Sequence, residues 1–229
     1  MTPNSSDRFP FDIIGFDLDG TLLDTSGDLM AAVNHALGLA GRPLLEVAEV
    51  KSIIGAGAKN TLLRALEETG GVPDDFRPLY KEMLRFYEAN IAVHTRPFDG
   101  ALPLLDQLDG MGIHTAIVTN KFESLAVKAL TELGLIGRFE TVIGGDTLGT
   151  ANAKPSAAPI HEMIDRLGGG RAAFIGDSIY DVQAARNAGV PSVAVSFGFV
   201  DGPIEELGAD AVIDHFDELV PVLARFGRG

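Results

Sequence analysis

Two aspartates at a spacing of two follow an apolar run near the N-terminus. Asp17 and Asp19 come directly after residues 13–16, Ile-Ile-Gly-Phe, and are followed by Gly20 and Thr21. If the run is a β-strand, both carboxylates leave it on the same side, and Gly20 allows a sharp turn that directs backbone N–H groups at an anion. A carboxylate with an ordinary pKa of about 4 is ionised at pH 7, so Asp17 could attack phosphorus and form an aspartyl-phosphate. Asp19 could protonate the leaving oxygen and later deprotonate water, although the same residues also occur in solvated turns.

A second apolar run also ends in acidic residues. Asp177 and Asp181 follow the run at residues 172–175. Carboxylates that meet at the ends of two strands repel one another by about 1 kcal/mol per pair at 4 Å in water, and by more at a lower dielectric constant. We therefore expect Mg²⁺ among them, held by Asp17, Asp177 and a backbone carbonyl, because this ion prefers oxygen ligands. Asp181 is also a candidate N-cap of the following helix, a role compatible with orienting the site.

A lysine and a Thr-Asn pair complete the candidate site. Lys154 precedes Pro155, and a proline in the first turn of a helix would place this lysine at the helix entrance as a fixed cation. Thr119 and Asn120 follow the apolar run at 115–118, where a hydroxyl and an amide could bind phosphate oxygens. Taken alone, each motif also fits an exposed lysine or an ordinary turn.

Short apolar runs indicate the elements that must position these residues. Near-continuous apolarity, without strict alternation, predicts strands covered on both faces and hence a parallel α/β sheet. Helices are predicted between the later strands at 124–133 and 181–188, because each stretch ends at a glycine suited to a left-handed cap. The predicted strands are residues 13–16, 115–118, 141–143, 172–175, 192–195 and 211–213.

One long interval contains no convincing strand. A βαβ unit would return to the sheet sooner, so we expect an all-helical cap at residues 25–93, inserted into a discontinuous core of residues 1–24 and 94–229. The helices predicted within this interval are residues 28–39, 46–54, 58–69 and 74–92.

The composition limits the partners of the protein. Among 229 residues, 18 Lys and Arg against 32 Asp and Glu give a net charge of −14, which predicts repulsion from nucleic acids and from anionic membranes. The sequence has no cysteine, which excludes disulfides, thiolate zinc sites and a cysteine nucleophile. Residues 1–10 lack the apolar stretch of a secretory signal and no window reaches about 18 apolar residues, so we expect a cytoplasmic protein.

The order of these motifs resembles that of a known family, the haloacid dehalogenase superfamily. Its members carry four motifs in this order, and the match covers nearly the whole chain. The residues that carry the resemblance are Asp17, Asp19, Gly20, Thr21, Thr119, Lys154, Gly176, Asp177 and Asp181. The resemblance implies a Rossmann-like sheet whose first strand lies at the topological switch point, where an open α/β sheet binds its ligand.

The same resemblance implies a role for each residue. Asp17 would be the nucleophile, Asp19 the general acid and base, Thr119 a phosphate ligand and Lys154 the stabiliser of charge. The side chains of Asp17 and Asp177 and the backbone carbonyl of Asp19 would hold Mg²⁺. Dehalogenases and phosphonate-cleaving members lack a carboxylate at the position of Asp19, so this chain resembles a phosphatase or a phosphomutase.

Shorter segments resemble phosphoglycolate phosphatases, which makes 2-phosphoglycolate the leading expected substrate. These segments are Gly55-Ala56-Gly57, residues 118–121 and residues 144–146. Gly55 and Gly57 would belong to a loop that closes over the substrate, or to a plain turn between helices. Lys121 is a candidate contact for a substrate carboxylate. Residues 147–153 depart from the shorter or more basic stretch that usually precedes the catalytic lysine, which leaves the substrate open.

Two other functions stay open from the sequence. A sugar phosphomutase of the β-phosphoglucomutase type would return the phosphoryl group to a sugar. A regulatory module would accept phosphate on an aspartate without turnover, but such modules run to about one domain length without a cap, and Asp19 also argues against this reading. We expect a small phosphorylated metabolite as the partner, and a monomer or weak homodimer.

Overall fold

The computed structural model describes residues 9–46, 49, 53–54, 57–200 and 202–226. In this part of the chain, six parallel strands form the central sheet in the order β5, β4, β1, β6, β7, β8. Their bounds are β1 (Ile13–Phe16), β4 (His114–Val118), β5 (Thr141–Ile143), β6 (Ala172–Gly176), β7 (Ser192–Val195) and β8 (Ala211–Ile213). The predicted parallel sheet is confirmed, and each strand lies within one residue of its predicted bounds.

The first strand lies in the middle of the sheet. Phe16 of β1 pairs with Ile117 of β4 on one side and with Ile175 of β6 on the other. The chain builds the sheet outward from β1 to β4 and β5, then crosses to β6 and builds outward in the other direction. Because the strands are parallel, the carboxyl ends of β1, β4 and β6 meet at one edge, at the switch point where open α/β sheets bind ligands.

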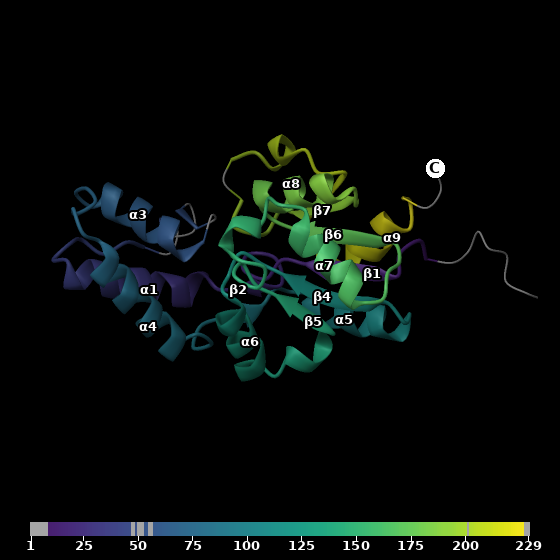
Figure 1. The fold of residues 1–229 in the computed structure, drawn as a ribbon, viewed down its shortest axis with the longest axis horizontal. Coiled ribbons are helices and arrows are strands. Elements are labelled where there is room, and N and C mark those ends of the chain that lie inside the picture. The colour runs from purple at the N-terminus through teal and green to yellow at the C-terminus, as the bar shows by residue number, and fades with distance from the viewer. Residues whose placement is uncertain (1–8, 47–48, 50–52, 55–56, 201, 227–229) are drawn as a thin grey trace, which may run out of the picture.

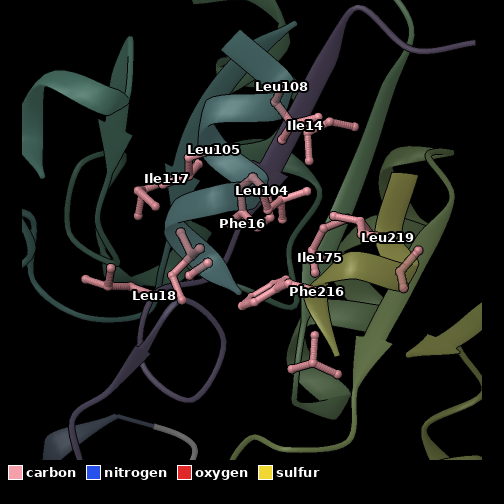
Figure 2. Packing of buried hydrophobic residues seen from close by; sticks show 14 of the residues in the cluster. Ile14, Phe16, Leu18, Leu104, Leu105, Leu108, Ile117, Ile175, Phe216 and Leu219 are labelled. Carbon is pink, nitrogen blue, oxygen red and sulfur yellow. The ribbon is translucent and has the colours of Figure 1, made fainter. Parts of the chain in front are cut away.

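Helices cover both faces of this sheet. One face carries α5 (Ala101–Gly110), α6 (Glu123–Glu132) and α9 (Leu219–Leu223), and the other carries α7 (Ala158–Arg166) and α8 (Ile179–Ala188). Figure 2 shows Ile14 and Phe16 of β1 packed with Leu104 of α5, whereas Ile13 packs on the opposite face with Met163 of α7. Burial on both faces explains why the strands have continuous apolar runs. Short 3₁₀ turns connect these elements: η1 (Ile136–Arg138), η2 (Thr150–Asn152), η3 (Ile204–Leu207) and η4 (Phe216–Glu218).

Three further helices form the inserted cap. These cap helices, α1 (Ser26–Leu39), α3 (Ala58–Glu68) and α4 (Arg77–Ala89), lie together beside the sheet (Figure 1) and share an apolar cluster that includes Ala36, Leu62 and Met83. The predicted helical cap is confirmed, because the described residues of the insertion form helices and irregular segments without a strand. The predicted helix at 46–54 lies largely outside the described residues. Within the described residues, none of the helices of the core or cap combines the length and apolarity needed to cross a membrane.

A two-stranded ribbon joins the cap helices to the core, and the sequence analysis did not predict it. The strands β2 (Leu23–Asp24) and β3 (Arg96–Pro97) are antiparallel. Asp28, in the first turn of α1, accepts hydrogen bonds from the backbone N–H groups of His94 and Thr95, both at 2.9 Å. The chain therefore enters and leaves the cap at adjacent points. Strands of two residues show no periodicity that a sequence pattern could reveal.

Candidate active site

A cavity of about 420 Å³ lies between the carboxyl edge of the sheet and the cap helices. Asp17 follows β1, Thr119 follows β4 and Asp177 follows β6, so the parallel pairing brings all three to one edge. These residues line the cavity together with cap residues that include Leu29 of α1 and Tyr87 of α4. The structure therefore brings Asp17, Asp19 and Asp177, three of the acidic residues that the sequence analysis selected, to one cavity.

Lys154 lies at the centre of the charged cluster. Its Nζ donates hydrogen bonds to Oδ1 of Asp17 at 2.7 Å, to Oδ1 of Asp181 at 2.6 Å and to the carbonyl oxygen of Val118 at 2.8 Å. These acceptors use all three ammonium protons. Burial acts against the charged form of Lys154, but the two carboxylates outweigh it and raise the pKa of this lysine. Lys154 is therefore a fixed positive charge beside the candidate nucleophile.

The prediction that Pro155 lies in the first turn of a helix is wrong. The helix α7 begins three residues later, at Ala158, and the proline in its first turn is Pro159. Residues 153–156 instead form a turn in which the N–H of Ser156 donates to the carbonyl of Ala153 at 3.0 Å. The position of Lys154 is set by its three hydrogen-bond acceptors rather than by a helix N-terminus.

Three carboxylates converge beside this lysine. Oxygen atoms of Asp17, Asp177 and Asp181 all lie within 4.8 Å of one another. Burial, together with the charge of Asp181, raises the pKa of Asp17 to about 6 despite the nearby ammonium group of Lys154. Burial and the charges of Asp17 and Asp181 also raise the pKa of Asp177 well above its usual range. The cluster thus holds more negative charge than one ammonium group offsets.

Asp177 is held by two groups that the sequence analysis did not assign to the site. The hydroxyl of Thr21 donates to its Oδ1 at 3.0 Å, and the backbone N–H of Phe199 donates to its Oδ2 at 2.7 Å. Thr21 lies within the first acidic motif and was therefore within reach of sequence reasoning. No local pattern marks Phe199, because its contact with Asp177 exists only in the folded chain.

Asp181 is not the N-cap of its helix. The N-cap is Ser178, and Asp181 is the third helical residue of α8 in a capping box. Oδ2 of Asp181 accepts hydrogen bonds from the N–H of Ser178 at 3.0 Å and from its hydroxyl at 2.6 Å, while Oδ1 binds Lys154. Because α8 begins at Ile179, two residues before the predicted start at residue 181, Asp181 lies inside the first turn and orients both the helix and the lysine. The spacing of Ser178 and Asp181 is a capping signature that the sequence contained.

The donor set fits a hard divalent cation. Asp17 and Asp177 are buried carboxylates that line the cavity, whereas Asp181, which binds Lys154 and Ser178, is not among the residues that line it. Oxygen ligands of this kind suit Mg²⁺ or Ca²⁺ better than a soft metal. Asp17 and Asp177 are thus the side chains best placed to hold such a cation.

Asp19 is bound by a second lysine. Nζ of Lys121 donates to Oδ1 and Oδ2 of Asp19 at 2.8 and 2.9 Å, and to the hydroxyl oxygen of Tyr87 at 2.5 Å. Burial disfavours the ammonium form of Lys121, but Asp19 and Tyr87 outweigh it and raise the pKa of this lysine. Burial raises the pKa of the Tyr87 phenol to about 12. Each of the two catalytic candidates, Asp17 and Asp19, therefore has its own ammonium partner.

Thr119 and Asn120, the predicted phosphate ligands, lie at the cavity, and their contact with phosphate stays a prediction. Both line the cavity, and Thr119 is only 4% exposed. The amide nitrogen of Asn120 donates to the carbonyl oxygen of Lys154 at 3.1 Å, so Asn120 also supports the loop that carries the lysine. The hydroxyl of Thr119 accepts the N–H of Lys121 at 3.3 Å, which leaves its proton available to a phosphate oxygen.

The turn at Gly20 was predicted to direct backbone N–H groups at an anion, but the N–H of Gly20 itself does not do so. This N–H donates to the carbonyl oxygen of Leu23 at 2.9 Å and therefore closes the turn instead of facing the cavity. Glycine is needed here for two other reasons. Its φ is +85°, and a Cβ at this position would lie 2.2 Å from Oδ2 of Asp177.

The expected cap loop is only partly described. Gly57 lines the cavity immediately before α3. Gly55 and Ala56 lie outside the described residues. A contact between Gly57 and substrate stays a prediction.

Comparison with known proteins gives consistent matches across the chain. Residues 14–195 match the family model described as haloacid dehalogenase-like hydrolase. A protein of Agrobacterium fabrum named phosphoglycolate phosphatase is 42% identical over 91% of this chain and 90% of its own length. A second protein with this name, from Caulobacter vibrioides, is 39% identical over 89% of this chain and 86% of its own length.

The fold is also found among solved structures. A crystal structure of a predicted phosphoglycolate phosphatase from Haemophilus somnus superimposes with a TM-score of 0.85 at 29% identity. The superposition covers 93% of this chain and 98% of the other. The arrangement of the sheet and cap described above is therefore shared with an experimentally solved relative.

Proposed function

The chain belongs to the haloacid dehalogenase-like hydrolases, and from this membership we propose that it hydrolyses small phosphomonoesters through a phosphoenzyme on Asp17, with 2-phosphoglycolate as the leading substrate. One observation carries the proposal. Asp17 and Asp19 line the same cavity, and each binds a different buried lysine, Lys154 or Lys121. A nucleophile and a separate proton donor are the two groups that this reaction needs.

The first half of the reaction transfers the phosphoryl group to the protein. A carboxylate oxygen of Asp17 attacks phosphorus, and the bond from phosphorus to the leaving oxygen breaks. The electron pair of that bond stays on the leaving oxygen, which takes a proton from Asp19. Lys154, which binds Asp17, offsets the negative charge that builds up on the phosphoryl oxygens, and the hydroxyl of Thr119 donates to one of these oxygens.

The second half releases phosphate. A water oxygen attacks phosphorus while Asp19 takes a proton from that water. The bond between phosphorus and the Asp17 oxygen then breaks, which restores the carboxylate of Asp17 and the proton on Asp19. The cap of residues 25–93 keeps bulk water out during the first half.

A divalent cation is part of the proposal. Bound to Asp17, Asp177 and the backbone carbonyl of Asp19, Mg²⁺ would offset the charge of the carboxylates and of the phosphoryl oxygens. The raised pKa values of Asp17 and Asp177 support this assignment, because a bound cation favours their ionised forms.

The experiment that tests the proposal is acid quenching with substrate labelled at phosphorus. We expect the wild-type protein to retain covalent label in the first turnover, and the Asp17→Asn variant to retain none. Phosphate release by Asp17→Asn falls by more than about 1,000-fold, because an amide cannot act as the nucleophile. Asp74→Asn, a matched change at an exposed position, keeps wild-type release.

Three results would contradict this function. Normal phosphate release by Asp17→Asn would rule out the covalent step. Isomerisation of hexose 1-phosphates without phosphate release would identify a phosphomutase. A single transfer to Asp17 without turnover would identify a regulatory module.

A further inference from the structure

Lys121 is saturated with hydrogen-bond acceptors. Its side chain is 5% exposed, and Nζ binds both oxygens of Asp19 and the hydroxyl of Tyr87. A lysine ammonium group has only three protons to donate. Any new partner of Lys121 must therefore replace one of these three acceptors.

The proposed reaction requires such a replacement. Asp19 has to bring a carboxyl oxygen to the leaving oxygen of the substrate, yet both of its oxygens now lie within 2.9 Å of one ammonium group. When Asp19 turns toward the leaving oxygen, Lys121 loses at least one acceptor. A buried ammonium group that loses an acceptor carries a large desolvation cost unless another anion takes that place.

Few other charged groups face the cavity. Among the described side chains that line it, the charged ones are Asp17, Asp19, Asp177, Lys154, Lys121 and Lys59. Lys154 is occupied on the phosphoryl side by Asp17 and Asp181. Lys59 lies on α3, with its Nζ 5.7 Å from the centre of the Phe76 ring. Lys121 is therefore the ammonium group beside Asp19, on the side where the leaving group must lie.

We propose that Lys121 determines specificity by exchanging Asp19 for a carboxylate on the leaving group of the substrate. The inference rests on the proposed phosphatase function. In such a substrate the carboxylate is attached to the same carbon as the leaving oxygen. When the leaving oxygen lies beside Asp19, this carboxylate is therefore close enough to reach Lys121. A neutral leaving group offers no replacement acceptor, so its reaction leaves Lys121 underpaired. The site thus selects phosphomonoesters of 2-hydroxy acids.

Tyr87 is a positioning residue in this exchange. Its hydroxyl binds Nζ of Lys121 at 2.5 Å, and its ring lies 4.6 Å from the same atom. Tyr87 is 2% exposed and belongs to α4, so this contact connects the cap directly to the lysine. The third hydrogen bond holds the ammonium group in place while its other partners change.

The experiment compares two substrates that differ only in the group that Lys121 would bind. They are 2-phosphoglycolate and 2-hydroxyethyl phosphate, which replaces the carboxylate with a neutral hydroxymethyl group. The wild-type protein is expected to prefer 2-phosphoglycolate by about 100-fold in kcat/KM, the size typical of leaving a buried charged group unpaired. In Lys121→Met this ratio falls to less than about 3-fold.

Two further variants complete the test. Tyr87→Phe lowers the same ratio, and it remains informative if Lys121→Met does not fold. Lys59→Met, a matched loss of a cavity lysine, keeps the wild-type ratio. A general defect in folding or in Asp19 would lower kcat/KM for both substrates equally and leave the ratio unchanged.

Each contrary outcome has a distinct meaning. If Lys121→Met or Tyr87→Phe slows both substrates by the same factor, Lys121 only holds Asp19 and the inference is wrong. If Lys59→Met removes the preference, the carboxylate binds on the cap and the inference is also wrong. If the wild-type protein hydrolyses both substrates equally, the inference fails while the phosphatase function stands. If it hydrolyses no phosphomonoester, both fail.

Discussion

At the scale of single residues, Asp177 and two glycines occupy one crowded space. A Cβ on Gly198 would lie 2.3 Å from the carbonyl oxygen of Gly20 and 2.4 Å from Cβ of Asp177. A Cβ on Gly20 would lie 2.2 Å from Oδ2 of the same aspartate. Asp177 therefore keeps its orientation only because both neighbours have no side chain.

We expect Gly198→Ala to lower the free energy of unfolding by about 1–3 kcal/mol, because the backbone of Gly20 has to move to admit the methyl group. Gly38→Ala is the matched control, since Gly38 lies within α1 and a Cβ there meets nothing within 4 Å. Replacing this helical glycine should raise the free energy of unfolding by about 0.5–1 kcal/mol. Urea denaturation measures both effects, and equal shifts in the two variants would contradict the steric argument.

At the scale of elements, the connection between cap and core depends on a buried carboxylate. Asp28 is 1% exposed, and its oxygens accept the N–H groups of His94 and Thr95 and the hydroxyl of Thr95. These residues immediately precede β3, which pairs with β2 at the start of the cap. The first turn of α1 and the ribbon are thus joined through one side chain.

Asp28→Asn is expected to lower the free energy of unfolding by about 2 kcal/mol, because an amide NH₂ group would face backbone donors that now bind a carboxylate. Amide hydrogen exchange at His94 and Thr95 should become faster in the same variant. Asp74→Asn, at an exposed cap position, should change neither quantity. If Asp28→Asn is as stable as Asp74→Asn, this side chain does not secure the junction.

At the scale of the whole molecule, the acidic cluster lies where the two units meet. The cap helices have an apolar cluster that also includes Leu125 and Ala129 of α6, and the cavity lies between the sheet edge and the cap. Buried charge at such a place costs stability unless a cation offsets it. The stability of the metal-free protein should therefore depend on pH.

The pKa of Asp17 is raised from 3.8 to about 6 in the folded protein. Between these values the folded state binds more protons than the unfolded state, so stability falls as pH rises from about 4 to about 6. Calorimetry in the presence of a chelator should show the Tm of the wild-type protein falling relative to that of Asp17→Asn across this range. Added Mg²⁺ should raise the Tm at pH 7 more in the wild-type protein than in Asp17→Asn. If the Tm of the wild-type protein changes with pH in the same way as the Tm of Asp17→Asn, the burial of the Asp17 carboxylate is not the cause of the pH dependence.

Most of the correct predictions came from patterns within short segments of the sequence. The strands were predictable because each is buried on both faces and carries a continuous apolar run. Parallel strands place the residues that follow them at one edge, so the proximity of Asp17, Thr119 and Asp177 followed from the order of the elements. The helix start at Ser178 was missed although its capping signature was present in the sequence.

By itself, the sequence determined the parallel sheet, the helical insertion and the acidic residues at the ends of the strands, because apolar periodicity and spacing are local properties of the chain. Only the tertiary structure decided that Lys121 binds Asp19 and Tyr87, that Phe199 holds Asp177 and that the Gly20 N–H turns away from the cavity. A hydrogen bond between distant residues depends on how the cap and the sheet are placed in space. No pattern within a short segment contains that information.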